Sequence, residues 1–165
     1  GVQTCALPIF IAIAEVATYA QSQGVKAHGM NLGGRYVFPF GSVKFVPALH
    51  SSGYEIDGVM TYMGEASGII LEAEDKKIYH AGDTALFSDM RLFAKDKSID
   101  VAFLPIGDNY TMGPEDALEA VSYLNPKITI PIHYNTFPVI QQNPAIFVEQ
   151  VVGGKVLNPG ETILV

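Results

Sequence analysis

Three histidines in this sequence directly follow short apolar runs, and an aspartate stands close behind one of them. His50 ends the run VKFVPALH, His80 ends KIYH and His133 ends KITIPIH, while Asp83 lies in HAGDT. Apolar runs of this length are typical of buried strands, whose last residues face the loops at the edge of a sheet. If these strands run in the same direction, their last side chains gather at one edge. Imidazole and carboxylate groups gathered in this way could bind a divalent metal ion.

Each of these residues also has a structural explanation when it is taken alone. A single histidine at a strand end is more often a hydrogen-bonding residue than a metal ligand. Asp83 could cap a helix that begins at Ala85. His80 could support the site or line a substrate pocket, or it could simply form a hydrogen bond at its strand end. The combination of three strand-end histidines, one aspartate in a turn and two flanking asparagines, Asn109 and Asn135, favours a site.

Other polar residues are weaker candidates for binding a substrate. Asn109 and Asn135 could contact it, although asparagines in turns need no such role. His28, in a glycine-rich stretch, could reach the site or a neighbouring subunit.

Alternative chemistries have little support in the sequence. The single cysteine, Cys5, excludes a disulfide framework and a cysteine-rich zinc site, so a metal centre has to use histidine, carboxylate and water. Ser51 beside His50 is a weak candidate nucleophile, because the sequence has no G-x-S-x-G elbow. It also has no G-x-G-x-x-G or Walker A motif for binding a nucleotide.

Composition bounds the class of protein. The chain has 165 residues, of which 48% are hydrophobic and 16% are charged, as is typical of one compact globular domain. No apolar run is long enough to span a membrane, and a net charge of −7 without a basic stripe argues against nucleic acid as a partner. The N-terminus lacks the basic region of a signal peptide, so we expect a cytoplasmic protein that binds a small-molecule substrate. A homo-oligomer is a common state for such enzymes.

The order of the expected elements predicts a layered α/β or α+β domain, with two sheets and helices outside them. We expect helices over 10–24, 85–96, 113–125 and 143–152, strands over 35–40, 42–49, 67–73, 77–80, 99–107 and 127–133, a polar connection over 50–66 and a closing hairpin over 154–165.

Four blocks of the sequence resemble a known family. PALHSS, KIYHAGDTALFSDM, DVAFLPIGDNYTMGPEDA and PIHYNTFP, in this order and spacing, resemble a small prokaryotic family of metal-dependent hydrolases in the metallo-β-lactamase superfamily, similar to the ascorbate-6-phosphate lactonases. The resemblance implies a four-layer αββα sandwich with a metal site at one rim. It also implies that His50, Asp83 and His133 are metal ligands, and that Asp83 bridges two ions.

One part of the superfamily pattern is missing from these residues. The H-x-H-x-D-H motif does not occur in the sequence. We therefore expect residues 1–9 to be a non-native segment, and residues 10–165 to be the C-terminal part of a single metallo-β-lactamase-like domain that is incomplete at its N-terminus. Little activity is expected from this part alone.

The resemblance implies a hydrolase that uses a metal-activated water on a small ester, lactone or phosphoester. Two divalent ions are expected in the intact enzyme, and zinc, manganese, iron and nickel all suit ligation by nitrogen and oxygen. Three alternatives remain open. They are a binding domain that keeps the fold without catalysis, an inactive fragment of the hydrolase, and a metal-free lactonase or esterase that uses Ser51 and His50.

Overall fold

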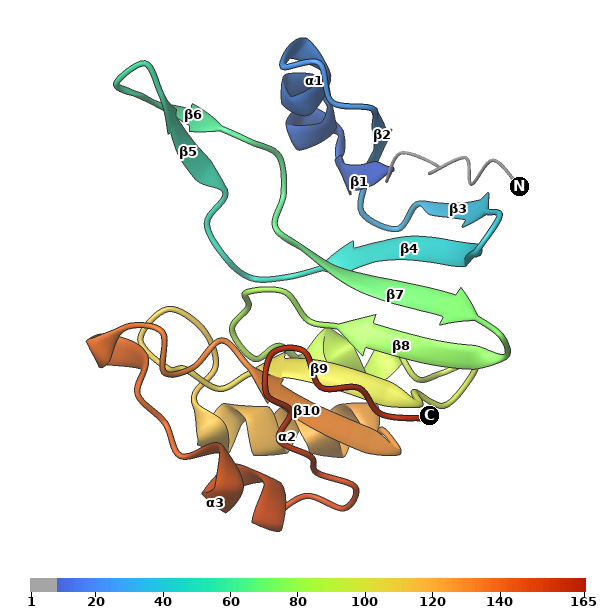
Figure 1. Cartoon of the computed structure of the whole chain (residues 1–165), viewed down its shortest axis with the longest axis vertical. Helices are drawn as coiled ribbons and strands as arrows, with labels where there is room; N and C mark the ends of the chain where they lie inside the picture. Colours follow the sequence, from blue (N-terminus) through green and yellow to red (C-terminus); the bar gives the residue numbers. More distant parts are fainter. Residues whose placement is uncertain (1–8) are drawn as a thin grey trace.

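A computed structural model describes residues 9–165 of the chain (Figure 1). Cys5 and all but the last residue of the segment 1–9 lie outside the described residues, so the expectation for that segment is not addressed by the structure. None of the helices within 9–165 has the length and apolar content needed to span a membrane.

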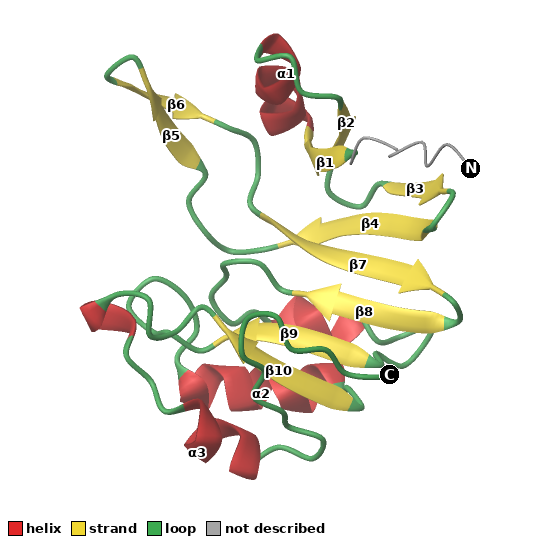
Figure 2. Ribbon diagram, viewed as in Figure 1, coloured by secondary structure: helices red, strands yellow, loops and turns green. Residues whose placement is uncertain are grey.

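A six-stranded mixed sheet forms the centre of the molecule, with the strand order β10-β9-β8-β7-β4-β3 (Figure 2). Strand β7 pairs antiparallel with both β4 and β8, while β8, β9 and β10 pair in parallel. Four strands, β4, β8, β9 and β10, therefore run in the same direction and end at one edge. The strands are β3 (Arg35–Phe38), β4 (Gly41–Pro47), β7 (Ser67–Ala73), β8 (Lys76–His80), β9 (Val101–Pro105) and β10 (Ile128–Ile132).

The other elements complete a layered arrangement around this sheet. A parallel two-stranded sheet, β1-β2, lies on one side with helix α1, and a small hairpin, β5-β6, projects from the body (Figure 1). These elements are β1 (Phe10–Ile13), α1 (Ala14–Ser22), β2 (Ala27–Met30), β5 (Gly53–Ile56) and β6 (Val59–Tyr62). The remaining helices are η1 (Ser88–Leu92), α2 (Pro114–Leu124), η2 (Pro138–Ile140) and α3 (Pro144–Glu149).

Hydrophobic clusters on both faces of the large sheet hold four layers together. Successive strand side chains point to opposite faces. Phe45 of β4 therefore packs with Ile13 and Met30 of the β1-β2 sheet, while its neighbour Val46 packs with Met90 and Leu124 from the helices on the other face. The order is α1, the β1-β2 sheet, the six-stranded sheet, then η1 with α2. This confirms the predicted αββα sandwich, in which the described part of the smaller sheet has two strands.

Two expectations for the N-terminal half were wrong. The helix predicted over 10–24 begins only at Ala14, because Phe10–Ile13 pair as a strand with Ala27–Met30. The connection predicted over 50–66 contains the β5-β6 hairpin. Its turn residues, Asp57 and Gly58, both have positive φ, as in the tight turns that join such strands.

Two expectations for the later segments were also wrong. The segment 85–96 contains only the 3₁₀ helix η1, because the backbone N–H of Ala85 donates to Leu49 O and Phe87 is extended. No hairpin forms over 154–165 in the described chain. Gly154 instead bridges in parallel to Thr129, so the segment begins as an extension of the sheet beyond β10.

A buried aspartate ties β8 to the start of β10. Asp100 accepts hydrogen bonds from Lys127 Nζ at 2.7 Å and from the backbone N–H of Lys77 at 2.8 Å, and its side chain is 4% exposed. The Lys127 hydrogen bond, followed by the Lys77 N–H, lowers the pKa of Asp100 below its ordinary value. The charged carboxylate is therefore the form that stabilises the fold.

Asp100→Asn should lower the free energy of unfolding at pH 7 by about 1–3 kcal/mol, because a hydrogen-bonded charge is removed. The pKa of Asp100 is lower in the folded than in the unfolded state. Its contribution is therefore present above about pH 4 and is lost as the pH falls through the folded-state value. Urea unfolding from pH 7 to pH 3 should show the difference between the two proteins narrowing in acid. A difference that stays constant with pH would contradict this account.

Candidate metal centre

The carboxyl ends of β4, β8, β9 and β10 meet at one edge, and their loops are connected through Thr84. Its hydroxyl accepts the backbone N–H of Leu49 at 2.9 Å, and its carbonyl accepts that of Met112 at 2.9 Å. The Ala85 N–H donates back to Leu49 O at 3.0 Å. Thr84 is fully buried, so it fixes the loop of Asp83 against the loops that follow β4 and β9.

Asp83 and His133 face each other across this edge. His133 Nε2 lies 3.5 Å from Asp83 Oδ2, which is longer than an ordinary hydrogen bond. Two ligands of one tetrahedral zinc ion, bound at about 2.0–2.2 Å, lie about 3.4 Å apart. The Asp83 carboxylate also makes no hydrogen bond within residues 9–165. The separation and the uncommitted oxygens therefore fit a pair of ligands to one divalent ion.

The position of His133 depends on an unusual backbone conformation and on a neighbouring glycine. His133 has φ 54°, a left-handed conformation that few non-glycine residues adopt. A Cβ placed on Gly107, in the loop after β9, would overlap the carbonyl oxygen of His133 and lie 3.1 Å from its Nδ1. Nδ1 is buried and has no hydrogen-bond partner among the described residues. Gly107 therefore leaves the room that this histidine occupies.

Left-handed residues are concentrated around the same edge. Of the eight non-glycine residues with positive φ in the described chain, four lie in the loops after β9 and β10: Asp108, Asn109, His133 and Asn135. Such conformations cost free energy and persist where the surroundings enforce them, often at functional sites.

His50 lies in the loop after β4, as its position at a strand end predicted. Its Nδ1 lies 2.8 Å from the carbonyl oxygen of Ser51, which leaves Nε2 uncommitted. Within residues 9–165, no three His, Cys, Asp or Glu side chains lie close enough together to hold a metal ion. The structure therefore brings Asp83 and His133 together, but it does not place His50 with them.

His80 is engaged at the end of β8. Its Nδ1 accepts the backbone N–H of Gly82 at 3.1 Å, and its ring stacks on Phe103 with the centroids 5.6 Å apart. Partial burial of the ring lowers the pKa of His80, and the nearby Asp83 carboxylate opposes that shift. An imidazole that accepts at Nδ1 is neutral and presents an N–H at Nε2.

The three expected substrate-binding residues differ in their surroundings. Asn109 is exposed beside Asp108, whose carboxylate accepts its backbone N–H. Asn135 is exposed and accepts the backbone N–H of Gln142 at 2.8 Å, which closes its loop. His28 lies in β2 and packs against Tyr36, with the ring centroids 4.4 Å apart. Its described ring contacts are thus with the aromatic side chains of β3.

The structure also bears on two alternatives: Asp83 as a helix cap, and Ser51 with His50 as a nucleophile and its base. No helix begins at Ala85, so Asp83 does not cap one. The hydrogen bond between His50 and Ser51 involves the backbone carbonyl rather than the hydroxyl.

Sequence reasoning missed Thr84 and Gly107, although their places directly beside Asp83 and Asp108 were visible in the sequence.

Known proteins resemble this chain over most of its length. The model of the beta-lactamase superfamily domain matches residues 5–134. A UPF0173 metal-dependent hydrolase of Enterococcus faecalis is 97% identical over 155 residues, which are 94% of this chain and 69% of the relative. The chain belongs to the UPF0173 metal-dependent hydrolases of the beta-lactamase superfamily. A further UPF0173 protein, from Bacillus cereus, is 53% identical over 94% of this chain and 70% of its own length.

Solved structures share this fold. Igni18, a metallo hydrolase of the archaeon Ignicoccus hospitalis, is 35% identical, with a TM-score of 0.83 over 93% of this chain and 67% of its own. An isothiocyanate hydrolase from Delia radicum gut bacteria shares the fold, with a TM-score of 0.72 at 19% identity over 95% of this chain and 66% of its own. The predicted membership of the metallo-β-lactamase superfamily is confirmed, and the chain is a member of a family of metal-dependent enzymes.

Proposed function

We propose that this chain supplies metal ligands and substrate contacts for hydrolysis of a small ester, lactone or phosphoester. The observation that carries the proposal is the 3.5 Å pair of His133 Nε2 and Asp83 Oδ2, at an edge where four strands end. A divalent ion bound there would supply an activated water and polarise the scissile bond. The rest of the proposal concerns what the protein's own side chains do.

Asp83 and His133 hold the ion, and His50 offers its uncommitted Nε2 from the neighbouring loop as a further ligand. Asp83 is also the residue placed to bridge a second ion, as the family resemblance implies. The donor set of nitrogen and oxygen suits zinc, manganese, iron or nickel. Two ions would require ligands in addition to these three, because four-coordinate sites use three or four protein groups per ion.

The remaining polar groups would act on the substrate. His80, from the end of β8, can orient a substrate oxygen through its Nε2–H, because Nδ1 already accepts from Gly82. Asn109 and Asn135 carry amide groups on the loops that end β9 and β10 and could contact the substrate beside the ion. His28, the third expected substrate contact, would have to act from the β2 side of the molecule.

The composition of the chain supports a proposal about the location and the partners of the enzyme. We propose a cytoplasmic protein whose partner is a small molecule rather than nucleic acid or a membrane, in agreement with the net charge of −7. A homo-oligomer is a common state for such enzymes. Residues 10–165 are expected to act as one part of a single hydrolase domain.

The test uses the intact hydrolase domain of which residues 10–165 are expected to be one part. It measures hydrolysis of three chromogenic or pH-indicated substrates, namely p-nitrophenyl acetate, p-nitrophenyl phosphate and γ-butyrolactone. Activity on at least one should disappear after chelation and return when one of the four metals is added. Activity that survives exhaustive chelation and is lost in Ser51→Ala would replace the proposal with a serine mechanism. Bound metal without activity on any substrate class would favour a binding domain.

A further inference from the structure

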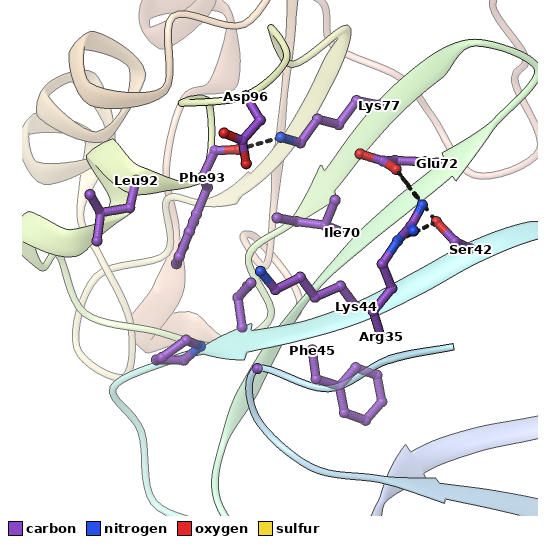
Figure 3. Close-up of a pocket in the computed structure, with 13 residues that line it drawn as sticks. Arg35, Ser42, Lys44, Phe45, Ile70, Glu72, Lys77, Leu92, Phe93 and Asp96 are labelled. Atoms are coloured by element: carbon purple, nitrogen blue, oxygen red, sulfur yellow. Dashed lines mark hydrogen bonds and ion pairs between the residues drawn. The ribbon is translucent and has the colours of Figure 1, made fainter. Parts of the chain in front are cut away.

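A cavity of about 530 Å³ opens on the outer face of the large sheet, between β4, β7, β8 and the end of η1 (Figure 3). Its lining contains three cationic side chains: Arg35, Lys44 and Lys77. None of Asp83, His133 and His50 contributes to it. The cavity is therefore separate from the edge that carries the candidate metal centre.

Lys77 is a buried cation in the lining of this cavity. The residue is 5% exposed, and its Nζ donates to the carbonyl oxygens of Phe93 at 2.5 Å and Lys97 at 3.2 Å. An ammonium group has three N–H donors, so two carbonyls leave one of them available. No carboxylate of the described chain lies within ion-pair distance of Nζ. A buried ammonium without a counter-ion is unfavourable, which points to an anion that is bound from outside.

Lys44 adds a second charge to the same space. Its side chain extends into the cavity from β4, and within residues 9–165 it forms neither a hydrogen bond nor an ion pair (Figure 3). Burial lowers the pKa of Lys77, the charges of Glu72 and Asp96 raise it, and the charges of Lys44 and Lys97 lower it. The Lys44 and Lys77 ammonium groups repel each other, and an anion bound beside both would offset that repulsion.

Two carboxylates also line the cavity, and neither lies within ion-pair distance of Lys44 or Lys77. Glu72 pairs with Arg35 at 3.0 Å, and Arg35 Nε donates to Ser42 Oγ at 3.1 Å, so this cluster is already satisfied. Asp96 is exposed and forms no ion pair with any residue of the described chain. Lys44 and Lys77 therefore remain available to a ligand.

The rest of the lining is apolar. Ile70 and Phe93 are buried walls of the cavity, and Leu92 is 60% exposed beside it. We propose that the cavity binds a phosphate monoester, with the phosphate between Lys44 and Lys77 and an apolar body against Phe93 and Leu92. A doubly charged oxyanion matches two ammonium groups, and charge-assisted hydrogen bonds to phosphate are short and strong.

Calorimetric titration of chelator-treated protein with phenyl phosphate, inorganic phosphate and phenol tests the proposal, because chelation removes binding at any metal. Phenyl phosphate should bind saturably at one site per chain and at least about tenfold more tightly than inorganic phosphate, while phenol should not bind. Lys44→Ala should weaken binding of phenyl phosphate at least about tenfold, and Lys44→Arg should restore most of it. Lys26→Ala, at an exposed position outside the cavity, is the matched control and should bind like the unchanged protein.

Several outcomes would overturn the assignment. Absence of saturable binding, or equal binding by Lys44→Ala, would show that the cavity is not a phosphate site. Equal affinity for phenyl phosphate and inorganic phosphate would remove the apolar part of the ligand and with it the monoester. Because Lys44 is exposed, Lys44→Ala should fold normally, and its circular dichroism spectrum verifies this before the titration.

Discussion

In the intact hydrolase domain, Asp83→Asn should reduce metal-dependent hydrolysis at least about 100-fold, because even loss of a residue that only supports a metal ligand costs about 10–100-fold. The substitution keeps the shape of the side chain and removes the charge that would hold the ion. Asp83 makes no hydrogen bond within residues 9–165, and its side chain is 49% exposed. The stability of the Asp83→Asn variant to urea should therefore change little, and the loss should be confined to activity and metal affinity.

The matched control is Asp89→Asn, which removes an exposed carboxylate from η1, six positions further along the chain. Asp89 accepts a hydrogen bond from the Ser88 hydroxyl at 3.2 Å and contacts no residue of the site. The Asp89→Asn variant should retain the activity of the unchanged protein. If both variants kept full activity, Asp83 would not be a ligand of a catalytic ion.

Gly107→Ala should destabilise the fold by about 1–3 kcal/mol, the usual range for overpacking, or by somewhat more because the obstacle is backbone. The added methyl would overlap the carbonyl oxygen of His133 and lie 3.1 Å from Ile140 Cβ, and Ile140 is fully buried. Relief of the overlap has to displace the backbone of Gly107 or of His133, so affinity for metal should fall together with stability. Urea unfolding and metal titration measure the two effects.

Gly113→Ala provides the comparison, since a Cβ there would be 3.3 Å from the Asp108 carboxyl carbon, a contact that a small shift of the side chain relieves. It should cost less than about 1 kcal/mol, the usual size of a small helix-start effect. If Gly107→Ala had the same stability and metal affinity as the unchanged protein, the loop after β9 would adapt easily and would not position His133.

The direction of the strands decided how much of the site could be predicted. Apolar runs located β8, β9 and β10, and each was followed by a polar loop, but a run of apolar residues does not carry its own direction. Because β7 pairs antiparallel with both β4 and β8, those two strands run in the same direction, and only the fold supplies that pairing. Asp83 and His133 could thus be predicted as candidates, whereas their approach to 3.5 Å could not.

The errors have physical causes in particular contacts. The segment after Asp83 has helical spacing, yet the hydrogen bonds of Leu49 with Thr84 and Ala85 hold its start extended and leave room for only a 3₁₀ turn. Tertiary hydrogen bonds of this kind override local propensity. The β5-β6 turn, by contrast, carries the Asp57–Gly58 pair, a hairpin signal that the sequence offered and that was given too little weight.

The central claim is that Asp83 and His133 ligate a divalent ion, and elemental analysis by mass spectrometry tests it most directly. The protein would be purified without chelators, beside Asp83→Asn and His133→Gln. The account predicts at least about one zinc, manganese, iron or nickel ion per chain in the unchanged protein and a large loss in both variants. Absence of metal from all three proteins, or equal metal in all three, would contradict it.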